Sequence, residues 1–510
     1  MECKTVKQPV CVNQTVFFQK GEIPFDLDFS LPDYCPDIRK ILKCRVTPGI
    51  FSKAATGQSI TVDGQISVCV FYCDEQNGVY SYEQTVPFNK TFQGEENLDG
   101  ALVEICTKLQ YVNCRAVSER KIDIHGAVAI SVGANCLKTF EILSDADRPD
   151  FQFERAEMPT LNAISNAEKN LLVEERLDIS SSLPTVGCIL KSSAEISVDE
   201  VKPIRSKVNV KGNLSVEVLY CDEQHRRYQN YSTVIPYSQF IDMPEVREDC
   251  RCECRAQICF LEVKPIKGSE ECRSLSMNAK VFMQVSAYCD RNVPVILDLY
   301  STRYEIDAKR EELPMDRICS SLKDRYTYQG VMDFPLKDLA GILDFSRESE
   351  TVGCRFENGK VLVSLRLNVG FLYCNSDSQI SYAEKSEEFT YEHPVEDSIG
   401  ENAVCNPDFR IASVSYNILS ESQVEFRVEY TVGLCIHEVK NIRAVARWEE
   451  DSQKVKGTPD CSLVAYFAAK GEKIWDIAKR YNSNFAEMQA LNGLKETEVP
   501  EQRCLLIPVR

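Results

Sequence analysis

Alternating apolar and polar residues dominate three widely separated stretches of the chain. Residues 60–74 read ITVDGQISVCVFYCD, residues 207–222 read KVNVKGNLSVEVLYCD, and residues 423–436 read QVEFRVEYTVGLCI. In each stretch, valine, isoleucine, leucine, phenylalanine or tyrosine recurs at every second position, which is the pattern of a half-buried antiparallel strand. The pattern predicts a mainly β fold.

The end of one such strand recurs along the chain. VFYCDEQ at residues 70–76 returns as VLYCDEQ at 218–224 and, less closely, as GFLYCNS at 370–376. Each copy of this Tyr-Cys anchor has a second anchor at the same distance before it. The two anchors together occur three times and predict three tandem repeats of about 150 residues, which is far longer than a solenoid unit. The second anchor is an Ile-Leu pair whose leucine precedes the tyrosine by 30 residues: Ile41 and Leu42, Ile189 and Leu190, Ile342 and Leu343.

Each repeat is expected to form an antiparallel β-sandwich-like domain, because half-buried strands must pack against a second layer. Short helical stretches are expected near residues 162–176 and 336–343. A polar segment containing Gly457 and Pro459 follows the third repeat and is expected to be a linker. The predicted boundaries are 1–150, 151–310 and 311–445 for the repeats, 446–462 for the linker and 463–510 for a small C-terminal domain.

The repeated Tyr-Cys pair is interpreted as a packing element. Neighbours in a strand point to opposite faces of the sheet, so the tyrosine continues the apolar row and the cysteine faces the other way. The acidic residues that follow begin a turn. An active site would need such a motif once, whereas a copied structural unit needs it every time.

The last fifty residues have a different pattern, which predicts the order strand, helix, helix, strand. Residues 463–468 form the first strand and residues 504–509 the second. The first helix presents Ile474, Ile477, Ala478 and Tyr481 on one face, and the second presents Phe485, Met488 and Leu491. Further signals are Asn484 with Glu487 as a helix start, Asn492-Gly493 as a helix stop, and Trp475 as a core residue.

Charge and hydropathy exclude several classes of partner. With 59 Lys and Arg against 77 Asp and Glu, the net charge is −18, and duplex nucleic acid requires a basic face. An anionic membrane surface is disfavoured for the same reason. No run of about 20 apolar residues exists, so membrane insertion is not expected. The start, MECKTVKQPVCVNQ, lacks the apolar core of a signal peptide, so we expect a cytosolic protein.

No catalytic constellation is present in the sequence. The motifs GxxxxGK[ST], GxGxxG, GxSxG and HExxH are all absent. The 4 histidines do not occupy equivalent repeat positions. With 77 acidic residues in the chain, a pair of carboxylates is no evidence for a general acid and base. We therefore expect no enzyme activity, no catalytic residue and no cofactor.

The 24 cysteines are many for a cytosolic chain. The default interpretation is free, mostly buried thiols, and cross-linking in an extracellular assembly is the alternative. No CxxC spacing occurs, so the usual zinc knuckle is absent. Cys250, Cys252 and Cys254 are expected on one face of a strand. They form either a site for a soft metal or for oxidation, or a row of small buried residues. We favour the buried row and predict no metal site.

The C-terminal domain closely resembles the LysM family. The residues that carry the resemblance are Tyr466, Lys470, Gly471, Ile474 to Ala478, Tyr481, Leu491, Asn492, Pro500 to Gln502, Ile507 and Pro508. The family implies recognition of N-acetylglucosamine-containing glycans, chiefly peptidoglycan, in a groove between two loops. Carried over, the binding residues are Gly471, Glu472, Lys473 and Ile474 in one loop, and Asn492, Gly493, Leu494 and Lys495 in the other.

Two departures from the LysM pattern keep a protein ligand open as the alternative. The family usually has Asp and then Thr or Ser after the glycine, where this chain has Glu472 and Lys473, and Glu501 replaces a glycine before the last strand. Residues 461–510 carry 7 basic and 6 acidic residues, whereas the rest carries 52 against 71. The domain can therefore approach an acidic wall or partner that would repel the body.

Three such repeats followed by one LysM domain resemble the clostridial spore-coat morphogenetic proteins of the SipL type, whose repeat is called the SPOCS domain. LPDYCPDIRKIL at residues 31–42 is typical of the start of that repeat. The resemblance implies a protein made in the mother-cell cytoplasm and recruited to the forespore surface. There it would attach the spore coat through the morphogenetic ATPase of the base layer.

The leading hypothesis is thus a non-enzymatic coat-assembly scaffold whose LysM domain docks a partner or cortex glycan. The alternative is a peptidoglycan-binding protein that anchors the chain to cortex or cell wall. A wall hydrolase is disfavoured, because the repeats offer no site for chemistry.

Overall fold

The computed structural model describes residues 4–266, 272–336, 338–396, 399, 403–456, 461–494 and 497–509. Within these residues the chain is mainly β, as predicted, with 2 short helices near the C-terminus. The first 18 strands fall into three sets of six. They are β1 (Lys4–Ser30), β2 (Lys40–Thr56), β3 (Ser59–Cys73), β4 (Val79–Gln93), β5 (Leu102–Ala116) and β6 (Lys121–Asp147); β7 (Phe151–Asp178), β8 (Cys188–Ile204), β9 (Lys207–Cys221), β10 (Tyr228–Asp242), β11 (Arg251–Pro265) and β12 (Ser274–Ser301); and β13 (Tyr304–Asp333), β14 (Leu339–Glu357), β15 (Lys360–Asn375), β16 (Ile380–Pro394), β17 (Ala403–Ser420) and β18 (Gln423–Val455).

Every set of six strands has the same topology. The second, third and fourth strands form one antiparallel sheet, and the first, sixth and fifth strands form another. The sheet orders are β2-β3-β4 and β1-β6-β5, then β8-β9-β10 and β7-β12-β11, then β14-β15-β16 and β13-β18-β17. The described part of the chain therefore holds three copies of one two-sheet unit.

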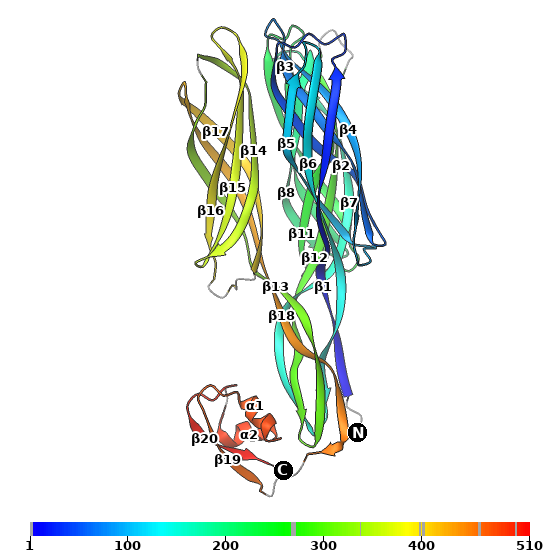
Figure 1. Cartoon of the computed structure of the whole chain (residues 1–510), viewed down its shortest axis with the longest axis vertical. Helices are drawn as coiled ribbons and strands as arrows, with labels where there is room; N and C mark the ends of the chain where they lie inside the picture. The colour runs from blue at the N-terminus through cyan, green and yellow to red at the C-terminus, as the bar shows by residue number, and fades with distance from the viewer. Residues whose placement is uncertain are drawn as a thin grey trace.

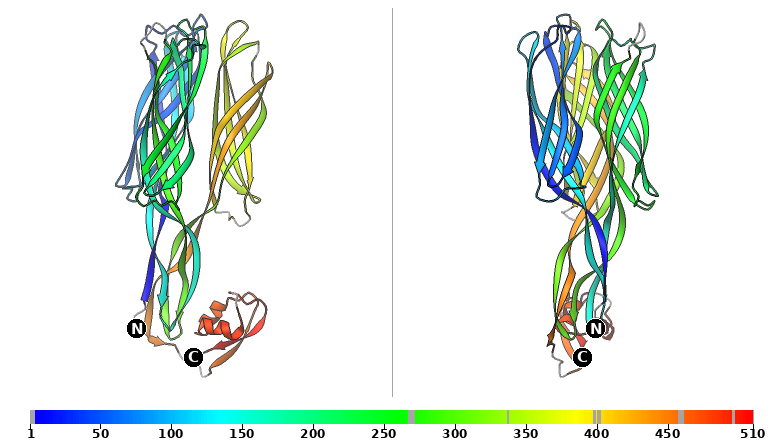
Figure 2. Two further views of the ribbon diagram at one scale, coloured as in Figure 1. Left: turned by 180° about the vertical axis from the view of Figure 1, so that it is seen from behind. Right: turned by 90° about the vertical axis from the view of Figure 1, so that its right-hand side faces the viewer.

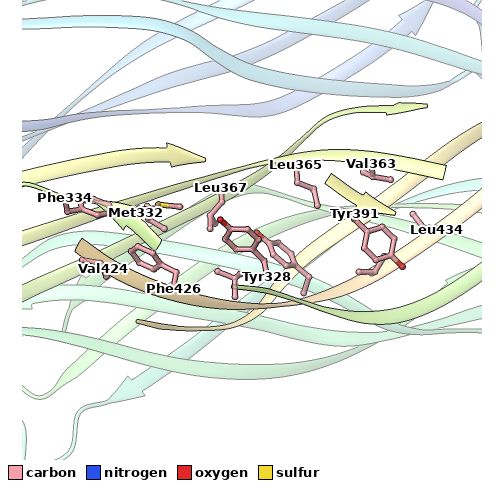
Figure 3. Packing of buried hydrophobic residues seen from close by; sticks show 14 of the residues in the cluster. Tyr328, Met332, Phe334, Val363, Leu365, Leu367, Tyr391, Val424, Phe426 and Leu434 are labelled. Atoms are coloured by element: carbon pink, nitrogen blue, oxygen red, sulfur yellow. The ribbon is translucent and has the colours of Figure 1, made fainter. Parts of the chain in front are cut away.

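Each unit forms a head in which the two sheets share a hydrophobic core (Figures 1 and 2). In the third head, Leu365 and Leu367 of β15 meet Phe426 and Tyr328 of the other sheet, as Figure 3 shows. Burial alternates along β15 because successive side chains point to opposite faces. A fully buried side chain of this size contributes about 1.5–3 kcal/mol.

The register of the strands explains the two repeated anchors. The isoleucine of each Ile-Leu pair lies opposite the tyrosine of the Tyr-Cys pair in the neighbouring strand. A register shift follows each isoleucine, so the leucine sits in a β-bulge. The paired residues are Ile41 with Tyr72, Ile189 with Tyr220, and Ile342 with Tyr373.

The opposite face of the same strands joins the three heads to one another. Phe71, Leu219 and Leu372 each precede the tyrosine of their repeat, and all three belong to one buried cluster. Leu190 of β8 and Cys221 of β9 lie in the same cluster. The copied motif therefore packs on both faces: the tyrosine within its head and its neighbours between heads.

The first and last strands of each set extend well beyond the head as two-stranded antiparallel ribbons. The three ribbons wind together into a stalk (Figures 1 and 2). Their core draws side chains from all three repeats: Val10 and Val12 of β1, Ile142 of β6, Val293 and Val295 of β12, Leu313 and Met315 of β13, and Ile442 and Ala444 of β18.

The two expected helical stretches are wrong. Residues 162–176 lie within β7, which pairs with β12 over nearly its whole length. Residues 339–343 begin β14, and residues 334–336 before them are not helical. The local preference for helix is overridden because these residues complete a ladder of backbone hydrogen bonds and alternate between two environments.

Two domain limits also differ from the prediction. The third set of strands begins at Tyr304, before the predicted start at 311. Residues 446–455, predicted as linker, complete β18 and pair with the start of β13. Trp448 anchors this segment, because its ring centroid lies 6.0 Å from that of Phe151. Residues 457–460 of the predicted linker lie outside the described residues.

Truncation of Leu219 tests the contact between the heads. Leu219 is 1% exposed, so Leu219→Ala should lower the free energy of unfolding by about 2–5 kcal/mol. Leu172→Ala is the matched control on β7, where the leucine is 60% exposed, and should cost less than about 0.5 kcal/mol. Urea unfolding followed by circular dichroism measures both, and equal losses would contradict the packing described.

Candidate functional site

The C-terminal module lies at the end of the stalk that is remote from the heads (Figure 1). It consists of β19 (Leu463–Ala468), α1 (Ile474–Arg480), α2 (Phe485–Asn492) and β20 (Arg503–Pro508), the predicted order. The Asn484 side chain accepts a hydrogen bond from the Glu487 backbone N–H at 3.1 Å, and Gly493 ends α2 in the left-handed conformation, at φ 62°.

One predicted position in α2 is wrong. Met488 is fully buried, but Leu491 is 50% exposed. At 3.6 residues per turn, Leu491 lies about 120° around the helix from Phe485, which takes it off the inner face.

Two of the four residues in the first predicted binding loop have structural roles within the module. Gly471 has φ 83°, which favours glycine. The Glu472 carboxylate accepts hydrogen bonds from the Ala469 backbone N–H at 2.9 Å and from the Tyr466 hydroxyl at 3.0 Å. Ile474 is fully buried in the core of the module. Gly471 and Lys473 are the exposed members of this loop.

The second predicted loop is also partly structural. The Asn492 amide oxygen accepts from the Leu506 backbone N–H, and the amide nitrogen donates to the Leu506 carbonyl, both at 2.7 Å. Leu494 is buried, whereas Gly493 is exposed. Lys495 lies outside the described residues.

The two loops are adjacent, because the segment that follows the second loop pairs with the first. The Ile474 N–H donates to the Thr497 carbonyl at 3.0 Å, and the Val499 N–H donates to the Glu472 carbonyl at 2.9 Å. Gly471 and Gly493 are exposed on these adjacent loops, but their N–H groups donate to the Val499 and Ala490 carbonyls. The exposed Lys473 side chain lies beside them.

An apolar strip lies on the outer face of the module's sheet, and the sequence reasoning missed it. Phe467 is 75% exposed, Leu463 47% and Leu506 38%. Ala465 of the same row pairs with Leu506. The signal in the sequence is that LVAYFA and CLLIP are apolar at successive positions, which leaves hydrophobic side chains on both faces of the two strands. Exposed apolar strips of this kind mark protein contacts.

The other side of the module packs against the stalk, and this contact is called the seat of the module below. Tyr300 of β12 belongs to the core of the module, and its ring centroid lies 5.0 Å from that of Trp475. The Tyr300 hydroxyl donates to the Ser483 carbonyl at 2.6 Å, and the Phe485 N–H donates to the Gln152 side chain at 3.1 Å. The seat therefore combines apolar burial with hydrogen bonds between repeat 2 and the module.

A carboxylate of the stalk completes the seat. Asp298 of β12 accepts from the Trp475 indole N–H at 2.9 Å and from the Lys479 ammonium group at 2.6 Å. Burial raises the pKa of Asp298, but these two donors outweigh it and the net shift is downward. The carboxylate is thus held ionised beside the module.

A cavity of about 710 Å³ lies between the three heads. Ion pairs join residues of its lining across repeats, with Lys191 2.8 Å from Asp344 and Arg347 2.6 Å from Glu217. These charged groups hold neighbouring heads together, so they are engaged in the structure of the heads.

The thiols at the start of β11 are part of a core, as the favoured interpretation predicts, although Cys250 lies just before the strand. Cys250, Cys252 and Cys254 all pack in the hydrophobic cluster of repeat 2. Burial raises the pKa of Cys252 and of Cys254 to about 12, which keeps both thiols protonated and unreactive.

Comparison with known protein families bears on the heads. Two regions match the family model described as SipL, SPOCS domain. They are residues 37–117 and 185–266, which span β2–β5 and β8–β11, the same four strands of the first and second repeats. In the third repeat, β14–β17 occupy the places that the SPOCS match covers in the other two. No curated protein and no solved structure matches the chain.

The SPOCS match relates the chain to a sporulation family of the SipL type and supports that part of the expected resemblance. Neither α1 nor α2, the helices within the described residues, has the length and apolarity needed to cross a bilayer.

Replacement of Asp298 tests the seat of the module. Asp298→Asn removes the charge that holds Trp475 and Lys479, so docking should weaken by about 1.5–3 kcal/mol, as for hydrogen bonds to charged groups. The expected readout is faster proteolysis between stalk and module. Asp307→Asn, at an exposed position of β13, should leave the proteolysis rate unchanged, and a faster rate there would contradict the assignment.

Trp475→Ala should unfold the module while the stalk stays folded. Trp475 is 5% exposed, and truncating a buried tryptophan costs about 3–5 kcal/mol. This loss exceeds the free energy of unfolding expected of such a small domain. Trp448 is then the remaining tryptophan and reports on the stalk. Loss of the module's helical circular dichroism with unchanged Trp448 emission is expected; an unchanged helical signal would refute the core position.

Proposed function

We propose that the chain is a non-enzymatic scaffold for assembly of the spore envelope. Its heads present copied β surfaces to coat proteins, and its C-terminal module docks the protein on the forespore. The observation that carries the proposal is the threefold copying of one two-sheet unit, two copies of which match the SPOCS domain. A copied unit with its motif committed to packing is suited to presenting surfaces.

The proposed partner of the module is the morphogenetic ATPase of the coat base layer. The apolar strip formed by Leu463, Ala465, Phe467 and Leu506 supports a protein ligand, because exposed aromatic and aliphatic groups supply binding energy when a partner covers them. The protein is then made in the mother-cell cytoplasm and recruited to the forespore surface. The heads and the module lie at opposite ends of the stalk, which suits a protein that connects two layers (Figure 1).

Charge supports the same arrangement. Residues 461–510 carry 7 basic and 6 acidic residues, whereas residues 1–460 carry 52 basic and 71 acidic residues. An acidic body remains soluble and repels acidic surfaces, and the near-neutral module can approach them.

The second candidate function is binding of peptidoglycan glycan by a LysM-like module. The adjacent placement of the two predicted loops, with the Lys473 side chain exposed on one of them, favours it. The commitment of Glu472 to its own turn and of Asn492 to β20 weakens it. This candidate places the chain in the cortex or wall.

Binding assays on the full chain with Phe467→Glu separate the two functions. If the partner is a protein, the variant should bind the purified base-layer ATPase at least tenfold more weakly than the parent chain, because a buried charge opposes burial of the strip. Phe18→Glu is the matched control, at a position of β1 that is 62% exposed, and should bind normally.

Retention of the parent chain on purified peptidoglycan, with no affinity for the ATPase, would instead establish the second candidate. Release of muropeptides by the full chain would overturn the non-enzymatic assignment.

A further inference from the structure

Three metal-ligating side chains meet where repeat 2 contacts repeat 3. Cys435 and His437 lie two residues apart on one face of β18, and Glu253 comes from β11. The Cys435 sulfur lies 3.2 Å from His437 Nε2 and 3.4 Å from a carboxylate oxygen of Glu253. One donor atom of each residue lies within 4.8 Å of the others. Neither the SPOCS match nor the packing of the heads explains this cluster.

The second nitrogen of the imidazole faces another carboxylate. His437 Nδ1 lies 3.6 Å from Asp316 Oδ1 of β13, and that oxygen is buried with no hydrogen-bond partner among the described residues. A carboxylate behind a ligating histidine fixes the ring and makes Nε2 a better donor.

The donor separations agree with those of a tetrahedral zinc site. Zinc–sulfur bonds of about 2.3 Å and zinc–nitrogen or zinc–oxygen bonds of about 2.0 Å at the tetrahedral angle place the sulfur about 3.5 Å from the nitrogen or oxygen. The observed separations of 3.2 Å and 3.4 Å are close to this value. We propose that Glu253, Cys435 and His437 bind one zinc ion, with Asp316 orienting His437.

The charges of the site balance around a divalent cation. One carboxylate and one thiolate neutralise Zn²⁺, and the imidazole binds as a neutral ligand. Zinc coordinates the deprotonated forms of a thiol and an imidazole, so its binding competes with protons.

A second thiol cluster in repeat 2 is less suited to a cation. Asp249, Cys250 and Cys289 lie within ligating distance of one another. However, the Arg247 guanidinium lies 3.9 Å from the Cys289 sulfur and places a positive charge at the same position. Repulsion between this charge and a metal ion favours the Glu253 site.

The proposed zinc ion joins two repeats just above the stalk. Glu253 belongs to the second set of strands, and Cys435 and His437 belong to the third. A shared ion therefore holds β11 against β18 at the level where the ribbons separate into heads. It acts as a structural clamp that sets how these two heads lie against each other.

Metal titration of the purified, reduced full chain tests the proposal. After removal of bound metal, addition of Co²⁺ should produce tetrahedral visible bands and a thiolate-to-cobalt charge-transfer band that saturate at one equivalent. Zn²⁺ should displace the cobalt and abolish the cobalt bands. Cys435→Ser and His437→Asn should each weaken binding at least a hundredfold, and Asp316→Asn should weaken it about 10–100-fold, as orienting residues do.

Matched variants distinguish this site from other thiols and imidazoles. Cys250→Ser removes a thiol of the second cluster, and His125→Asn removes an exposed imidazole between two acids; both should keep the cobalt spectrum and affinity. Circular dichroism verifies that every variant is folded. Binding that persists in folded Cys435→Ser, that disappears in Cys250→Ser, or that is absent from the parent chain overturns the proposal.

Discussion

Antiparallel pairing between the first and last strands of each repeat is the interaction on which the molecule depends. β1 pairs with β6, β7 with β12 and β13 with β18 over nearly their whole lengths. Each pair supplies two of the three strands of one sheet in its head and continues as a ribbon of the stalk. Because each pair is continuous, the hydrophobic contacts that hold the ribbons together also set where the heads lie. The three heads are thus held at both levels, by the stalk core and by the cluster around Leu219.

The polar residues between these two apolar layers have a distinct role. A buried polar group is costly unless it is paired, yet Asn13, Asp316 and His437 lie near the level where the ribbons diverge into heads. Apolar side chains would fill the space without any requirement for direction. Charged and hydrogen-bonded groups demand particular partners, so they can define the orientation of one head against the next. A zinc ion shared by Glu253, Cys435 and His437 would serve the same purpose with greater directional demand.

The seat of the C-terminal module restricts how it can bind. Trp475, Lys479 and Ser483 face the stalk, so the surfaces left free are the exposed parts of the two predicted loops and the apolar strip on the sheet. These free surfaces belong to a module anchored by an ionised Asp298, and the module presents them at a defined place at the end of the stalk. A scaffold gains from such placement because less orientational freedom is lost when the partner binds.

Local patterns in the sequence were enough to predict many of the strands, the repeat and the second helix of the module. Period-2 alternation identified strands such as β3 and β9, the spacing from Leu42 to Tyr72 revealed the repeat, and the helix signals around Asn484 and Gly493 located α2. These are properties of neighbouring residues, since alternation and capping depend on backbone geometry within a few positions.

Tertiary structure alone decided the rest. It placed residues 162–176 in a strand whose partners in β12 are at least a hundred residues away, and it brought Glu253 to Cys435 and Asp298 to Trp475. It also committed Glu472 to its own turn and Asn492 to β20. The reason is physical: such contacts depend on how ribbons twist and pack, and no period or spacing along one chain encodes which distant residue will lie opposite.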